Sequence, residues 1–406
     1  MDPEDTEFHC GEPISPDTDV QGVPIKPRSG DSAESSRNDP HGHAVRTMNN
    51  FNLLRFAAAS LVMVSHGFEL PSSATAHDWA YAVTGRALSW YAVNAFFVIS
   101  GYLIFASWQR KPFLVSFLWA RFLRIMPGLF TMLVSSVLIL GICFSTLAFA
   151  EYIANRETVT YFVGCLSILY VKYVLPGVFG LNPIQAVNGS LWTLRFEIFC
   201  YSCVAIAGLA GVLRYTRLRR IALWIWTAFA LSTLIWFDRR GLVQYAGKLG
   251  MVYELARLAT CFLLGGLYYE YEDKVPLWSV VLIALFGLML AVGRTPFFVP
   301  VAIIVTAYGT LWLAFVPNRK WIIWTRNAPD YSYGMYIYAY PVEQAVISLF
   351  PGITPGWIIV GSFGITMTFA TLSWHLIEKP SLALKQLTML SRLGKYTAIG
   401  KSRSSW

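Results

Sequence analysis

Ten apolar runs, separated by short polar segments, follow one another along most of the chain. They cover residues 51–68, 90–108, 124–149, 191–213, 221–237, 255–271, 277–292, 297–316, 331–350 and 357–377. Most of these runs approach the ~20 residues that a helix needs to cross the hydrocarbon core of a bilayer. The pattern therefore predicts an all-α fold, a polytopic membrane helix bundle of about ten transmembrane helices.

A further apolar stretch, residues 161–175, is shorter and ends at Pro176 and Gly177. We interpret it as a re-entrant or interfacial segment, because an additional span would invert the topology of everything that follows. With ten spans and a cytoplasmic N-terminus, 22 of the 32 Lys and Arg residues lie in cytoplasmic segments, 7 on the opposite side and 3 inside the runs. This bias predicts that both termini are cytoplasmic.

The two ends of the chain differ from its apolar middle. Residues 1–48 are polar and have too few large apolar side chains to offset the entropy lost on ordering. Residues 379–406 are basic and suit a short tail on anionic headgroups. We therefore divide the chain into a disordered N-terminal tail (1–48), a membrane domain (49–378) and a basic cytoplasmic tail (379–406).

The composition narrows the class of protein. Hydrophobic residues make up 55% of the chain and charged residues only 14%, compared with about 25% charged residues in soluble domains. The net charge of +9 comes from loops between apolar runs, which argues against a nucleic-acid partner and for topology determinants. Cys200 and Cys203 form a CxxC inside a predicted span without a histidine nearby, so we expect neither a redox site nor a metal.

The first predicted span, Asn52–Leu70, carries an arginine and a histidine. Arg55 and His66 are eleven residues apart, which is three helical turns plus about 20°, so both side chains share one face, roughly 16 Å apart. An ionisable group inside a bilayer costs about 3 kcal/mol or more, and the pair therefore predicts a polar chamber. His66 suits a general base or a transient acyl acceptor. The alternatives are a histidine hydrogen-bonded between helices and an Arg55 that reaches the headgroups.

Two arginines lie at the predicted cytoplasmic start of the third span. Arg121 and Arg124, in WARFLRIMP, share a helical face, and Pro127 suits a first helical turn. Forked guanidinium donors beside a helix N-terminus favour a phosphate. Ordinary positive-inside anchoring explains the same residues, and the pair alone does not separate the two interpretations.

The fourth predicted span contains a carboxylate. In NGSLWTLRFE, residues 188–197, Ser190 fits an N-cap, and Glu197 lies about two turns farther in, at a depth similar to that of His66. Glu197 either orients the imidazole of His66 or pairs with Arg195 or Arg257. Glu343 in the ninth span is another intramembrane carboxylate.

Six motifs occur in a fixed order along the chain. They are Arg-x10-His at 55–66, FFVISGYLI at 96–104, RFLRIMP at 121–127, NGSLWTLRFE at 188–197, SYGMYIYAYPV at 332–342 and IEKP at 377–380. Together they resemble the bacterial acyltransferase 3 family, whose members O-acylate lipopolysaccharide O-antigen, exopolysaccharides, Nod factors and other envelope sugars. The resemblance covers about residues 50–380.

The resemblance implies roles for individual residues. The family's essential pair maps on Arg55 and His66, and its Arg-x-x-Arg motif, implicated in holding the nucleotide phosphates of acyl-CoA, maps on Arg121 and Arg124. The family's SLWTL stretch with its glutamate maps on Ser190–Leu194 and Glu197. The chain departs from many members at Ala339, where they have a histidine, so it cannot depend on that side chain. We expect no hydrolase domain of the SGNH type after the last span, unlike in the longer two-domain members, and therefore acceptor transfer by the membrane domain itself or by a separate partner.

These observations predict a membrane enzyme that transfers an acyl group, most simply acetyl, from cytoplasmic acyl-CoA to a hydroxyl of an envelope or exported glycan. The expected co-substrate is acetyl-CoA, the acceptor a glycan or glycolipid, and the location the bacterial inner membrane. The alternative is a transporter of a glycolipid or anionic substrate. A transporter carries similar intramembrane charges, but it often shows repeat symmetry, and no internal repeat is visible in this sequence. A scaffolding role leaves Arg55 and His66 unexplained.

Overall fold

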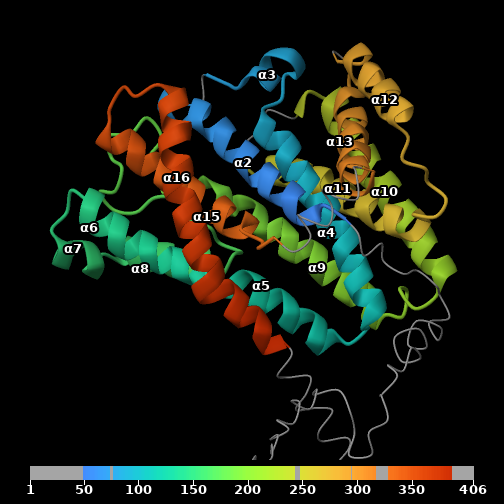
Figure 1. Cartoon of the computed structure of the whole chain (residues 1–406), viewed down its shortest axis with the longest axis horizontal. Helices are drawn as coiled ribbons and strands as arrows, with labels where there is room; N and C mark the ends of the chain where they lie inside the picture. The colour runs from blue at the N-terminus through green and yellow to red at the C-terminus, as the bar shows by residue number, and fades with distance from the viewer. Residues whose placement is uncertain (1–48, 74–75, 243–246, 294, 317–327, 386–406) are drawn as a thin grey trace, which may run out of the picture. The chain divides into compact units, whose positions relative to one another are not determined.

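The computed structural model describes residues 49–73, 76–242, 247–293, 295–316 and 328–385 (Figure 1). The regular secondary structure of these residues is helical, with no strand among them, and the all-α prediction is confirmed. The two predicted tails fall largely outside this range, since residues 1–48 and 386–406 are not described.

Within the described part of the chain, eight helices are long and apolar enough to cross a membrane, judged by length and composition. They are α2 (Phe51–Glu69) with η1 (Leu70–Ser72); α4 (Leu88–Arg110); α5 (Leu114–Ser135) with η2 (Ser136–Leu140) and α6 (Gly141–Phe144); η3 (Gly189–Thr193) with α9 (Leu194–Leu209); α10 (Thr216–Arg239); α11 (Lys248–Tyr271); α13 (Phe298–Phe315); and α16 (Pro355–Ser373) with η5 (Trp374–Glu378), continuing to Lys385. The other two predicted runs also form helices, α12 (Ser279–Ala291) and α15 (Ser332–Leu349). Because α12 has 13 residues and α15 is not among the eight, the count of about ten spans stays a prediction.

Helix α15 lies inside the bundle rather than against lipid. Of its 18 residues, 14 are buried, and it packs against α2 and α16. A helix surrounded by protein can carry polar side chains such as Glu343 and Gln344, because neighbouring protein groups are there to receive them. Its interior position accounts for a sequence that is less apolar than that of a lipid-facing span.

Helices α2 and α4 run next to each other, and α4 also packs closely against α11 (Figure 1). Two glycines permit the second contact. A Cβ atom added at Gly101 of α4 would lie 1.9 Å from the carbonyl oxygen of Phe262, and one at Gly265 of α11 would lie 2.1 Å from that of Val98. The two backbones therefore touch, as small residues allow in membrane helix pairs.

Helix α5 begins at Leu114, ten residues before the predicted start at 124. The prediction was wrong because the apolar stretch before Arg121 continues the helix, and arginines are tolerated inside a helix near a membrane surface. Arg121 and Arg124 therefore lie in the second and third turns, and Pro127 lies inside the helix. The expected contribution of a helix N-terminus to phosphate binding is absent at this pair.

The stretch 161–175 contains only part of a helix. Helices α7 (Phe149–Ala154) and α8 (Arg156–Leu166) have 6 and 11 residues, well below the ~20 needed to span. Much of the backbone that follows, up to residue 188, is irregular and docks on α15. Gln344 donates to the carbonyls of Ile184 (2.7 Å) and Ala186 (2.6 Å). At its end the N-cap is Asn188, whose side chain accepts from the backbone of Ser190, so the prediction of Ser190 as N-cap was wrong.

Candidate active site

A cavity of about 400 Å³ is lined by residues of α2, α4, α5, α9 and α15. Four of the five predicted site residues line it: Arg55 from α2, Arg121 and Arg124 from α5, and Glu197 from α9. Further polar side chains on its wall are Asn52, Ser100, Thr193, Tyr201, Asp330, Ser332, Tyr333, Tyr336, Trp374 and Lys385. His66, about three helical turns beyond Arg55 on α2, is not on this wall.

Asp330, directly before α15, joins two of the arginines. Its Oδ2 atom lies 2.5 Å from the guanidinium of Arg55 and 2.7 Å from that of Arg124. Ser332 donates to the other carboxylate oxygen, Oδ1, through its hydroxyl (2.5 Å) and its backbone N–H (3.3 Å). Burial raises the pKa of Asp330, but the two arginines and the Ser332 hydrogen bonds outweigh burial and lower the pKa to about 2. The carboxylate is therefore ionised near neutral pH.

Arg121 and Arg124 contact different partners, although they share a helical face. Arg124 also lies 3.5 Å from Glu378, in the π-helical turn η5. Arg121 donates to the hydroxyl of Ser107 (3.2 Å) and lies over the ring of Tyr201, with no carboxylate partner among the described residues. A guanidinium without a counter-ion beside a cavity is suited to bind an anion.

Glu197 is placed away from His66. It accepts a hydrogen bond from the hydroxyl of Tyr201, which also bonds to Ser100 across the cavity. Neither predicted arginine partner reaches it. Arg195 donates to Tyr173 and to the carbonyl of Trp192, whereas Arg257 donates to Glu254 and Asn94. The prediction that Glu197 lies at a depth similar to that of His66 was wrong. Glu197 lines the cavity with Arg55, whereas Gly189, two turns before Glu197, lies against Tyr340, the residue that packs on His66.

The carboxylate beside His66 is Glu343 of α15. Its Oε2 atom lies 3.7 Å from the Nδ1 atom of His66, and Tyr340 packs its ring edge-to-face on the imidazole at 5.0 Å. Glu343 is fully buried, and neither carboxylate oxygen has a hydrogen-bond partner among the described residues. Buried polar groups are nearly always hydrogen-bonded, and catalytic hydrogen bonds are often long until a substrate binds. At 3.7 Å the two side chains are neighbours but are not hydrogen-bonded to each other.

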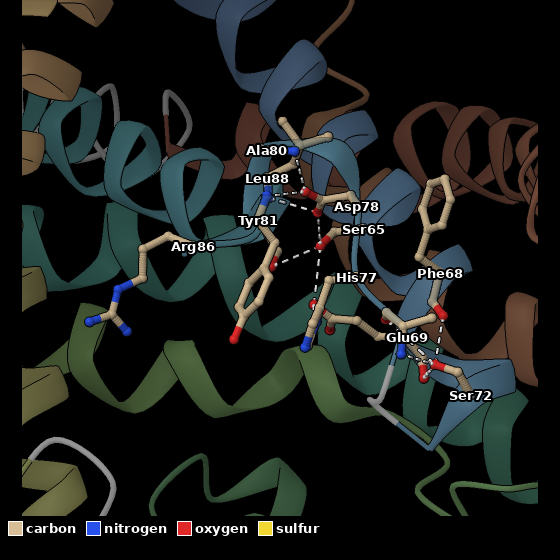
Figure 2. Close-up of polar contacts among 12 residues, drawn as sticks. Ser65, Phe68, Glu69, Ser72, His77, Asp78, Ala80, Tyr81, Arg86 and Leu88 are labelled. Atoms are coloured by element: carbon tan, nitrogen blue, oxygen red, sulfur yellow. Dashed lines mark hydrogen bonds and ion pairs between the residues drawn. The ribbon is translucent and has the colours of Figure 1, made fainter. Parts of the chain in front are cut away.

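A network of hydrogen bonds fixes the end of α2 next to His66 (Figure 2). Ser65 donates to the buried carboxylate of Asp78 (2.8 Å), which also accepts from the backbone of Ala80 (3.0 Å) and of Leu88 (2.8 Å). Asp78 thereby caps the short helix α3 (Trp79–Thr84) and ties it to α2 and to the start of α4. Glu69, one turn after Ser65, lies 3.9 Å from His77, which stacks on the ring of Tyr81.

The site thus has two parts, and helix α2 contributes a residue to each, Arg55 to one and His66 to the other. One is a cation-rich cavity around Arg55, suited to an anionic group, and the other is the His66–Glu343 pair, suited to proton transfer. No group of three His, Cys, Asp or Glu side chains in the described ranges is placed to hold a metal ion. Asp330 belongs to none of the six sequence motifs, and Glu378 is the glutamate of the IEKP motif, for which no role was predicted. Their positions beside predicted arginines come from the fold.

Comparison with known proteins matches residues 48–375 to the model of a family described as acyltransferase domain. A protein named O-acetyl transferase, from Shigella phage Sf6, is 28% identical over 342 residues, covering 82% of this chain and 95% of the relative. Nodulation protein 10 of Rhizobium leguminosarum bv. viciae is 27% identical over 411 residues, covering 86% and 98%. No solved structure matches the chain.

Proposed function

Because the chain belongs to the acyltransferase family and is an O-acyltransferase, we propose that it takes an acetyl group from cytoplasmic acetyl-CoA and transfers it to a hydroxyl of an envelope or exported sugar. The observation that carries the proposal is the cavity lined by Arg55, Arg121 and Arg124, on the same helix bundle as His66. We propose the bacterial inner membrane as its location, since acetyl-CoA is cytoplasmic and the acceptor is exported.

The donor would lie in the cavity. Coenzyme A carries several phosphates, and arginine forks suit phosphate oxygens better than they suit a neutral ligand. The thioester arm would extend from the phosphates past Arg55 towards His66, which lies eleven residues farther along α2. About 16 Å along the helix axis separates the two residues.

The transfer itself would take place at His66. The imidazole removes the proton from the sugar hydroxyl, whose oxygen attacks the thioester carbonyl carbon. The carbon–sulfur bond then breaks, and the leaving thiolate takes the proton from the imidazolium. In a second route, His66 attacks the thioester first and passes the acetyl group to the sugar. In both routes Glu343 holds the imidazole in place and stabilises its positive charge.

Two measurements test this function. Binding of acetyl-CoA to the purified full chain in detergent, followed by calorimetry, should be saturable and should be displaced by coenzyme A. The glycans of cells with and without the gene, compared by mass spectrometry, should differ by acetyl groups. Absence of donor binding together with identical glycans would contradict the proposal.

A further inference from the structure

A single oxygen atom, Oδ2 of Asp330, receives two guanidinium groups. Arg55 approaches it from α2 at 2.5 Å and Arg124 from α5 at 2.7 Å. The side chain of Asp330 is 8% exposed, while those of Arg55 and Arg124 are 22% and 20% exposed on the cavity side. Two forks that converge on one anionic oxygen at the wall of a cavity are the arrangement in which arginines bind a phosphate oxygen.

The donors of the cavity exceed what Asp330 can accept. Besides Arg55 and Arg124, the wall carries Arg121, and the carboxylates nearby are those of Asp330, Glu197 and Glu378. The buried Nε groups of Arg55 and Arg121 have no hydrogen-bond partner among the described residues. A larger anion with several acceptor oxygens would satisfy N–H groups that one carboxylate leaves unpaired.

We propose that Asp330 occupies the position of a phosphate oxygen until the donor binds, and that a phosphate of the donor then displaces its Oδ2 atom from Arg55 and Arg124. Asp330 is thus a specificity-determining residue: it neutralises the two arginines until an anion with more charge and more acceptor atoms arrives. The identification of that anion with a phosphate of acetyl-CoA rests on the proposed function.

The remaining contacts of Asp330 make the exchange feasible. Ser332 holds Oδ1 through its hydroxyl and its backbone N–H, and both hydrogen bonds can persist while Oδ2 turns away. The carboxylate therefore keeps partners after displacement, whereas the arginines exchange one anion for another. Without Asp330, the like charges of Arg55 and Arg124 would lie close together without the anion that both contact, which is unfavourable in a buried site.

The test measures affinity for two probes, acetyl-CoA and inorganic pyrophosphate, by calorimetry on the full chain. Asp330→Asn removes the competing charge and keeps the shape, so both probes should bind about tenfold more tightly, the scale of one hydrogen bond to a charged group. Asp330→Glu, which keeps the charge, is the matched control and should not show this gain. In the double variant Arg55→Gln with Asp330→Asn the gain should be lost, because the freed fork is gone.

A second variant covers the case in which Asp330→Asn does not fold. Ser332→Ala removes the hydroxyl that keeps Oδ1 paired after displacement, so displacement becomes less favourable and both probes should bind a few-fold more weakly. Unchanged or weaker binding in Asp330→Asn overturns the proposal, as does unchanged or tighter binding in Ser332→Ala where Asp330→Asn does not fold. If the protein binds pyrophosphate and the variants change that affinity as expected, but acetyl-CoA does not bind, the displacement of Asp330 is supported and acetyl-CoA as the donor is contradicted. Native protein that binds neither probe overturns both.

Discussion

His66 and Asp330 show what single side chains contribute to this site. His66 has a buried carboxylate 3.7 Å away, and Asp330 has two arginines within 2.7 Å of one oxygen. The first pair has hydrogen-bonding capacity that is unused among the described residues, whereas the second is closely paired. We therefore expect substitutions at the two positions to affect different steps, proton transfer at His66 and donor binding at Asp330.

Replacing His66 should stop the chemistry while leaving the protein in place. We expect His66→Ala to lower acetyl transfer by at least about a hundredfold, the lower range of general-base contributions. The variant should still insert and accumulate, because His66 is one side chain of a long apolar helix. The measurement is glycan acetylation in cells matched for protein level, with His375→Ala, an exposed histidine beside Tyr331, as control. Normal acetylation in His66→Ala would remove this histidine from the mechanism.

Lysine should not replace the two arginines of α5. If Arg121 and Arg124 bind donor phosphates as forks, the double change Arg121→Lys with Arg124→Lys should weaken acetyl-CoA binding by roughly 1–3 kcal/mol, because a point charge lacks the fork. Membrane insertion should not change, since the positive-inside rule counts Lys and Arg alike. If the native and doubly substituted proteins bind acetyl-CoA with equal affinity, the two arginines only anchor the helix at the membrane surface.

The sequence predicted part of this site, and the missing part has a physical reason. Spacing along one helix placed Arg121 beside Arg124 and aligned Arg55 with His66, since a helix fixes such relations locally. Asp330 was not identified, because it precedes its helix and its partners lie 206 and 275 positions away. Counting turns from the start of the fourth span suggested Glu197 for His66, but that span begins at residues already buried in the protein, such as Asn188 and Ser190, so Glu197 lies deeper, in the cavity with Arg55. The carboxylate beside His66 is Glu343.

Among the elements, the close pair α4 and α11 depends on glycine. We expect Gly265→Ala to destabilise the folded protein by roughly 1–3 kcal/mol, the usual cost of overpacking, because the new methyl group meets the backbone of α4. Gly361→Ala in α16 is the matched control, as a Cβ atom there meets nothing within 4 Å. Thermal unfolding in detergent measures both. Equal midpoints for the two variants would contradict the backbone contact.

Hydrophobic runs predicted the positions of the main helices but not all their limits. The third run was predicted to start at residue 124, but its helix starts at Leu114. The prediction failed because Arg121 and Arg124, which lie inside the helix, were taken as its boundary. Helix α15 was found from its apolar residues, but only the fold shows that 14 of its 18 residues are buried. Sequence periodicity identifies helices, whereas their neighbours decide which polar residues they can carry.

For the whole molecule, the topology can be tested directly. A reporter fused after Arg220 should be cytoplasmic, and one fused near Lys172 should be external. The predicted topology requires this, because it puts 22 basic residues on the cytoplasmic side and 7 on the opposite side. The 11 residues of α8 are too few to reverse this order. Alkaline phosphatase and green fluorescent protein fusions report the two sides. The same side for both fusions would show that the segment before residue 188 crosses the membrane.

If the donor binds as proposed, the stretch of α2 between Arg55 and His66 fixes the distance between its anionic end and its reactive carbonyl. Each residue added or removed between them would shift His66 by 1.5 Å and turn it by 100°, so no single insertion keeps both its distance and its face. Adding four residues nearly restores the face but lengthens the interval by about 6 Å. Only a donor whose anionic end and reactive carbonyl are separated by this fixed interval can occupy both ends at once, so small activated acyl compounds without a long arm should be poor substrates.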